Sequence, residues 1–246
     1  MVGVLIGFAA IGYGWSRNQP GGKETEKTAS HNEAGSTLSQ LHQFDTLLTI
    51  NNQRFQIHTK NISEDEVTLT VLCESECVMV DTISPYGFSN IEFPDFNGDG
   101  NADIMLSYSG NITSYNLYLF DEQNSTFKPV EGFSDYPEAV RLNSNPSYYY
   151  SYHRAGCADM NWVSDLFYIE SYKTVHVAHL YTQGCDYEDE GEKDERHGKI
   201  SVYKVNNGSK DRQKLVERLP VEAIHKYNNK WDFIEKYWNA SYKKYE

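Results

Sequence analysis

Asp95-Phe96-Asn97-Gly98-Asp99-Gly100-Asn101-Ala102-Asp103 is the most informative part of this chain. An oxygen-bearing side chain stands at every second position, and two glycines stand between them. Calcium takes about six to eight oxygen ligands, so a short loop around it must turn sharply and offer an oxygen at every second residue. The stretch predicts a calcium loop with side-chain oxygens from Asp95, Asn97, Asp99 and Asp103 and the backbone carbonyl of Asn101.

The segments on either side of this loop predict strands rather than helices. Ile91-Glu92-Phe93-Pro94 and Ile104-Met105-Leu106-Ser107-Tyr108 are apolar or β-prone, and Pro94 disfavours an entering helix. An EF-hand needs a bidentate Glu at position 12, where this chain has Leu106. We therefore expect a strand–loop–strand calcium site. The alternative is an ordinary Asn/Gly/Asp turn, in which clustered like charges would repel one another without a cation.

The motif Asp95-x-Asn97-x-Asp99-Gly100-x-x-Asp103, followed by an apolar strand, resembles the calcium loop of FG-GAP and VCBS-type β-repeats. Residues 116–121 and then Phe127 resemble the strand–turn–strand that follows it there. The likeness covers about residues 91–131 and a single copy of the loop. The chain also resembles small single-loop bacterial periplasmic proteins, some of which are immunity proteins that inhibit secreted lysozyme-like effectors. The resemblance implies a calcium-binding, propeller-like β-protein and inhibition of such a hydrolase.

The overall charge of the chain narrows the classes of partner. The 246 residues carry a formal net charge of −13, which argues against nucleic acid or an anionic lipid surface as partner. It favours a basic partner protein. The length allows one large β domain or two small ones, and 19 tyrosines help to supply a core.

The N-terminal region predicts export. Residues 1–16 are uncharged and mostly apolar. As a helix they would span about 24 Å, at about 1.5 Å per residue, short of a hydrocarbon core of about 30 Å. We interpret them as an export signal or N-terminal anchor of a protein of the periplasm, or anchored facing it; the alternative is a buried core segment. The composition of residues 17–40 predicts a disordered linker, and residues 41–246 a calcium-binding β domain.

The body of the chain alternates short apolar runs with polar turns. Five hairpins are expected, with turns at 51–53, 74–76, 121–125, 171–173 and 206–209. Hairpins in chain order predict an all-β, mostly antiparallel meander, folded as a sandwich or small propeller. Apolar residues at helical spacing from Val221 to Tyr242 predict a C-terminal α-helix.

The four cysteines fit this arrangement of hairpins. A turn at 74–76 would place Cys73 opposite Cys77, and a hairpin centred on Ser171 would place Cys157 and Cys185 at its base. The sequence therefore predicts two disulfides and an oxidising compartment. The alternative, a four-cysteine zinc site, lacks the C-x-x-C spacing.

No set of catalytic residues emerges from the sequence. His176 and His179 are three residues apart, so on a straight strand they would point to opposite faces and could not share a metal ion. His153 and Cys157 would not form a nucleophile pair if Cys157 is disulfide-bonded. No pair of the 35 acidic residues stands out for glycosidase chemistry. We expect a protein that is not an enzyme.

Two segments have the composition of a contact surface. Residues 145–154 combine Tyr, Ser and Arg as recognition loops do, although a strand with alternate tyrosines in the core is an equal alternative. Residues 186–195 hold seven acids and one Lys, which suits a solvated loop or one that steers a basic partner. The candidate partner-binding residues are Tyr148, Tyr149, Tyr150, Tyr152, Arg154, Asp186, Glu188, Asp189 and Glu190.

Together these features predict an exported β-protein with one structural calcium ion that binds a partner protein, with a basic, lysozyme-like cell-wall hydrolase as the candidate partner. Two other classes stay open: a hydrolase acting on glycans or the cell wall, and a cell-surface adhesion or scaffold module. A deep cleft with a catalytic pair would favour the hydrolase. A protruding Tyr-rich or acidic loop would favour the inhibitor.

Overall fold

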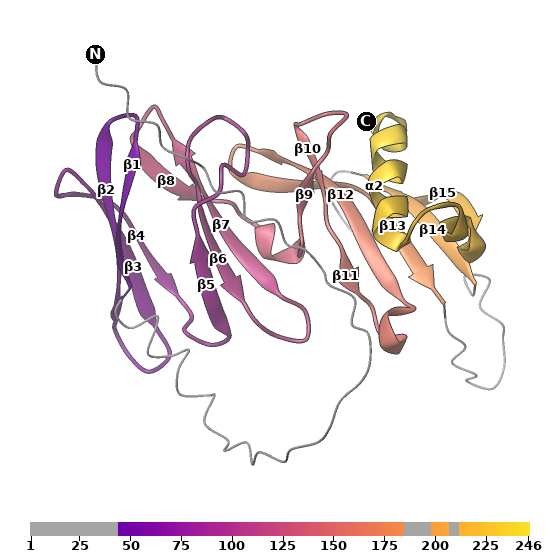
Figure 1. Cartoon of the computed structure of the whole chain (residues 1–246), viewed down its shortest axis with the longest axis horizontal. Helices are drawn as coiled ribbons and strands as arrows, with labels where there is room; N and C mark the ends of the chain where they lie inside the picture. The colour runs from indigo at the N-terminus through magenta and orange to yellow at the C-terminus, as the bar shows by residue number, and fades with distance from the viewer. Residues whose placement is uncertain (1–43, 185–197, 207–211) are drawn as a thin grey trace, which may run out of the picture. The chain divides into compact units, whose positions relative to one another are not determined.

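Three antiparallel β-sheets follow one another along the chain (Figure 1). The computed structural model describes residues 44–184, 198–206 and 212–246. The expected export segment at 1–16 and linker at 17–40 lie outside these residues. The predicted fold class, mostly antiparallel β with a C-terminal α-helix, is confirmed, and so are all five hairpins.

The first sheet is a four-stranded meander paired in sequence order. Its strands are β1 (Asp45–Ile50), β2 (Gln53–Asn61), β3 (Val67–Cys73) and β4 (Glu76–Ile83). The turn residues Asn51 and Asn52 have φ of 50° and 64°. Positive φ at both central residues is the mark of the two-residue turn that matches the twist of paired strands. Every second residue of β3 is buried, so one face of the sheet packs on the core.

The second hairpin of this sheet overturns the expected Cys73–Cys77 disulfide. Its turn contains two residues, Glu74 and Ser75, so Cys73 lies opposite Glu76 and Cys77 lies opposite Leu72. A shift of one residue moves a side chain to the other face of the sheet. Cys73 is therefore buried, Cys77 is exposed, and both are free thiols. Cys157 is disulfide-bonded, and its expected partner Cys185 lies outside the described residues.

The second sheet contains the predicted strand–loop–strand unit. Its strands are β5 (Phe88–Glu92), β6 (Ile104–Tyr108), β7 (Ser114–Asp121) and β8 (Thr126–Pro129). The first and second sheets share one hydrophobic core. At its centre the Phe55 ring lies edge-on to Phe120 and Phe127, with centroids 5.5 and 5.7 Å apart. Apolar burial between the two sheets thus holds the β5–β6 loop on a rigid base.

The third sheet is the largest, with the strand order β15-β14-β13-β12-β10-β9, and β11 also pairs with β12. Its strands are β9 (Val140–Arg141), β10 (Tyr148–Tyr150), β11 (His153–Arg154), β12 (Trp162–Glu170), β13 (Lys173–Gln183), β14 (Lys199–Val205) and β15 (Gln213–Pro220). Two short 3-10 helices, η1 (Phe133–Asp135) and η2 (Cys157–Asp159), lie in its connections. A separate core, which includes Leu119, Phe133 and Phe167, packs the second sheet against the third.

The C-terminal helix α2 (Lys230–Ser241) covers one face of the third sheet (Figure 1). Its buried Trp238 donates a hydrogen bond from Nε1 to Ser164 Oγ on β12, at 2.9 Å. The helix begins later than the spacing predicts, because residues from Val221 form the 3-10 helix η3 (Val221–Lys226). Asn229 then caps α2 by accepting a hydrogen bond from the Asp232 backbone, and η4 (Tyr242–Lys244) follows.

Candidate functional sites

The β5–β6 loop gathers the predicted calcium ligands into one tight turn. Asp95 Oδ2 accepts the Gly100 N–H at 3.0 Å. Asn97 Oδ1 accepts the Asp99 N–H at 3.0 Å, and Asp99 Oδ1 accepts the Asn101 N–H at 2.8 Å. Gly98 and Gly100 adopt φ of +71° and +92°, which L side chains rarely tolerate. The loop's own backbone thus fixes a set of oxygens suited to a hard cation.

Asp103, the last residue of the loop, connects it to β7. Its side chain is fully buried, Oδ2 accepts the Phe96 N–H at 2.9 Å, and Oδ1 accepts the Phe120 N–H at 2.8 Å. Burial raises the pKa of Asp103 to about 6, aided by the nearby charge of Asp99 and opposed by backbone hydrogen bonds. A cation in the loop would favour the ionised form of this buried carboxyl group.

The β5–β6 loop also contacts the third sheet. The Phe96 ring stacks on Tyr149 of β10, with centroids 4.9 Å apart and planes at 11°. A Cβ placed on Gly98 would lie 1.6 Å from Arg141 Nη1, so the Arg141 guanidinium of β9 lies directly against the loop. Arg141 is held there by a hydrogen bond from Nε to Pro146 O at 2.8 Å. The loop therefore contacts one side chain of β9 and one of β10.

The tyrosine-rich segment forms strands rather than an exposed recognition loop. Tyr149 and Tyr152 are only 4% and 7% exposed, which corrects their expected role as surface anchors. Tyr148 and Tyr150 are partly buried, and Arg154 is exposed. The strand alternative holds because Tyr149 packs against Phe167 in the core between the sheets. The acidic candidates Asp186, Glu188, Asp189 and Glu190 lie outside the described residues.

A pocket of about 460 Å³ lies beside β9, β10 and the start of α2. It is lined by Glu138, Val140, Tyr150, Tyr152, Asn228, Asn229, Trp231, Asp232, Ile234 and Glu235. We call it the acidic pocket. The Trp231 side chain is 52% exposed. Partial burial and the charge of Asp159 raise the pKa of Glu138, whose backbone also has a positive φ of 51°. The pocket therefore combines an exposed indole with three carboxyl groups.

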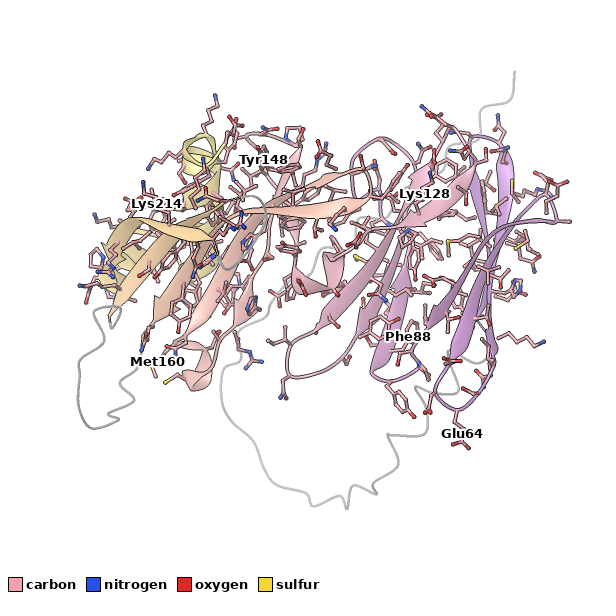
Figure 2. The ribbon with its side chains drawn as sticks, turned by 180° about the vertical axis from the view of Figure 1, so that it is seen from behind. Glu64, Phe88, Lys128, Tyr148, Met160 and Lys214 are labelled. Atoms are coloured by element: carbon pink, nitrogen blue, oxygen red, sulfur yellow. The ribbon has the colours of Figure 1, made fainter. Side chains whose placement is uncertain are left out.

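A second pocket, of about 360 Å³, is lined by residues of the third sheet. Figure 2 views the molecule from behind, with the strands of this sheet in front of α2. The lining residues of the pocket are His153, Val163, Asp165, His176, His179, Tyr181, Tyr203 and Gln213. We call it the histidine pocket. Asp165 points into it, whereas the preceding residue, Ser164, points toward α2 and bonds to Trp238. This alternation is the normal two-residue period of a strand.

A β-bulge brings His176 and His179 to the same face of β13. Asp165 pairs with His179, Leu166 with Ala178 and Phe167 with His176, so Val177 is an extra residue without a partner on β12. Val177 and Ala178 both pack in the core under α2. The extra residue reverses the parity of the strand. The expectation that the two histidines point to opposite faces is therefore wrong, and their rings lie 5.7 Å apart.

His176 and Asp165 form a buried pair in this pocket. His176 Nε2 lies 2.9 Å from Asp165 Oδ1 and 3.1 Å from Ala178 O, and both side chains are 5% exposed or less. Burial tends to raise the pKa of Asp165, but the hydrogen bond from His176 and the neighbouring imidazoles hold it below 3.8. Within the described chain His176 Nδ1 has no hydrogen-bond partner. Such an orphan nitrogen costs about 1–3 kcal/mol and calls for a functional explanation.

The sequence contained one overlooked signal for this pocket. Asp165 interrupts the apolar run of residues 162–170, and an ionisable side chain in a strand buried on both faces requires a partner. The distance of 14 residues between Asp165 and His179 gave no such indication, because only the paired register of β12 and β13 makes them neighbours.

Comparison with known proteins finds similarity among solved structures. No protein-family model matches the chain. No curated protein matches it either. The chain is similar to a solved structure described as that of a Xanthomonas type IV secretion system related protein, with a TM-score of 0.42 and 17% identity over 71% of this chain and 94% of that one. In the part of the chain that the structure describes, no helix has the length and apolar character needed to span a membrane.

Proposed function

We propose that this chain is an exported, calcium-binding protein that binds a basic partner protein, and that the partner is a lysozyme-like cell-wall hydrolase that it inhibits. The observation that carries the proposal is the acidic pocket, where the half-exposed Trp231 stands among Glu138, Asp232 and Glu235. An exposed indole in a pocket supplies large contact area, and carboxylates attract a cationic side chain. An Arg or Lys of the partner is the expected occupant.

The electrostatics of the whole chain support a basic partner. With a net charge of −13, the chain attracts cationic proteins over a distance set by ionic screening, about 8 Å at physiological salt. Lys230 lies beside the pocket, bound to Asp159 and packed over the Tyr152 and Trp231 rings at 4.9 and 4.6 Å. Its charge offsets part of the effect of burial and of Asp159 on Glu138, so the pKa of Glu138 is still raised.

Calcium would act through the strands that line this pocket. The loop holds β9 through Arg141 and β10 through Tyr149, while Val140 and Tyr150 of the same two strands line the acidic pocket. Binding of an ion to the loop would restrict both strands and so reduce the entropy lost when the partner binds. The proposed role of calcium is structural, and partner binding is expected to require it.

We assign the acidic pocket a binding role rather than a catalytic one. A glycosidase needs one protonated carboxyl group and one free carboxylate facing the substrate. Asp232 is paired with Lys236 Nζ at 2.8 Å, and Glu235 Oε1 accepts a hydrogen bond from Asn143 at 3.0 Å. Two of the three carboxyl groups therefore already have partners.

The test measures inhibition and binding with a purified basic lysozyme-like hydrolase. We expect the full chain to inhibit peptidoglycan lysis in calcium and to lose inhibition in chelator. Trp231→Ala should weaken binding by about 30-fold, the effect of losing a buried hot-spot aromatic. Leu47→Ala is the matched control, because Leu47 is 72% exposed on β1, in another sheet.

Three outcomes would overturn the proposal. One is lysis of peptidoglycan by this protein alone, which would support the hydrolase alternative. A second is equal loss of binding in the Trp231 and Leu47 variants. The third is an association rate that does not fall as salt rises, since screening must weaken a steering field.

A further inference from the structure

We propose that Asp165, His176 and His179 form a binding site for one zinc-class divalent metal ion, separate from the calcium loop and independent of the partner-binding role. One ligand atom from each residue lies within 4.8 Å of the other two. Within residues 44–184, 198–206 and 212–246 they are the one group of three His, Cys, Asp or Glu side chains that meet this closely. They also line a cavity of about 360 Å³, which supplies space for the ion and a further ligand.

The donor chemistry selects the metal. Two imidazoles and one carboxylate suit zinc and its first-row neighbours, whereas calcium prefers oxygen ligands alone. Zinc bonds of about 2.0–2.2 Å place tetrahedral ligand atoms roughly 3.3 Å apart. His176 Nε2 and Asp165 Oδ1 are already 2.9 Å apart, so a small side-chain rotation admits the ion. The metal would take the place of the proton that these two atoms now share.

The surroundings hold these three side chains in position. Ser151 Oγ lies 3.4 Å from Asp165 Oδ2, the oxygen that does not face His176. The Tyr136 ring lies edge-on to His176 at 5.9 Å, and the Tyr203 ring packs beside His179 at 4.9 Å. Neighbours that orient ligand side chains in this way are a regular feature of protein metal sites.

The β-bulge gives the site its geometric basis. Deviation from regular pairing is common next to functional sites, where a bulge redirects a side chain. Here Val177 places both histidines on the Asp165 face, so an ion would bridge β12 and β13 across the irregular part of their ladder. The fourth coordination position would be open to the cavity, where a water molecule or an anionic group can bind.

Zinc titration of the full chain, with calcium in excess, tests the site. We expect one tightly bound Zn²⁺ per chain, and cobalt should give the visible absorption of a tetrahedral site with nitrogen and oxygen ligands. His179→Gln should weaken zinc binding by at least about 100-fold, because losing a ligand exceeds the effect of losing a supporting residue. His179 is partly exposed, so this variant should fold, and circular dichroism checks that it does.

His225→Gln is the matched control, since His225 is exposed in η3 and should leave zinc binding unchanged. His176→Gln tests zinc binding at the same site through its other histidine. The proposal is overturned if the chain binds no zinc, or if folded His179→Gln binds zinc as well as the original protein. Equal losses in the His179 and His225 variants would likewise overturn it, because they would indicate weak surface binding. None of these results bears on Trp231, so the partner-binding proposal stands or fails separately.

Discussion

The β5–β6 loop, with its predicted calcium ligands, and the histidine pocket differ in how their residues come together. The loop is nine consecutive residues, Asp95 to Asp103, and its oxygens are oriented by hydrogen bonds within the same stretch. The histidine pocket is assembled from β12 and β13, and its geometry depends on the extra residue Val177. A spacing rule can be applied to the first, because its residues are near neighbours in the chain. It fails for the second, because one inserted residue reverses which face a side chain occupies.

The largest effect is expected in the histidine pocket. Asp165→Asn should lower the free energy of unfolding by about 3–5 kcal/mol, because it removes the acidic member of a buried Asp–His pair. Since the pKa of Asp165 is held below its ordinary 3.8, this contribution is present above that pH and is lost as pH falls through the lower folded value. Urea denaturation across this range measures it. Asp45→Asn, at an exposed position of β1, is the control.

Substitution of Asp103 is the corresponding test in the loop. Asp103→Ala should lower the free energy of unfolding by about 3 kcal/mol, because the partly buried N–H of Phe96 and the buried N–H of Phe120 lose their carboxylate acceptor. The pH dependence has the opposite sign to that of Asp165. The folded pKa of Asp103 is raised to about 6, so the calcium-free protein should lose stability as pH rises from 3.8 through about 6. If Asp103→Asn keeps this slope, the assignment is wrong.

Calcium should stabilise the folded protein through the loop and not through the histidine pocket. An ion that binds only the folded state adds about 2.7 kcal/mol when its concentration is a hundredfold above the dissociation constant. Calcium should therefore raise the melting temperature, and Asp99→Ala should abolish the rise. His179→Gln should leave it intact, since the histidine pocket is a separate site. An unchanged melting temperature in calcium and in chelator would contradict a calcium loop.

The smallest effect is expected at the first-sheet cysteines. Cys77→Ser should change stability by no more than about 0.5 kcal/mol, because Cys77 is an exposed free thiol. A thiol reagent should label Cys77 in the folded protein, while Cys73, only 8% exposed, should react after unfolding. Recovery of a peptide with Cys73 bonded to Cys77 would show that the turn is longer than the two residues described.

Errors of interpretation from the sequence share one cause. The predicted Cys73–Cys77 disulfide is wrong because the turn has two residues instead of three. The prediction that His176 and His179 point to opposite faces is wrong because β13 contains a bulge. The tyrosines of β10 were ambiguous because their composition suits both a contact surface and a core. Each case depended on register or burial, which arise from pairing between distant segments.

Local sequence signals correctly predicted the all-β class, the paired strands of the five hairpins and the strand–loop–strand unit, because turn chemistry and two-residue periodicity act between near neighbours in the chain. The calcium ligands of residues 95–103 stay a prediction from ligand spacing. Tertiary structure was needed to show that Cys73 and Cys77 are free, which tyrosines are buried, and that Asp165, His176 and His179 share one pocket. The physical reason is that successive side chains of a strand point to opposite faces of the sheet. A single bulge, or a turn shorter by one residue, therefore exchanges the buried and exposed positions.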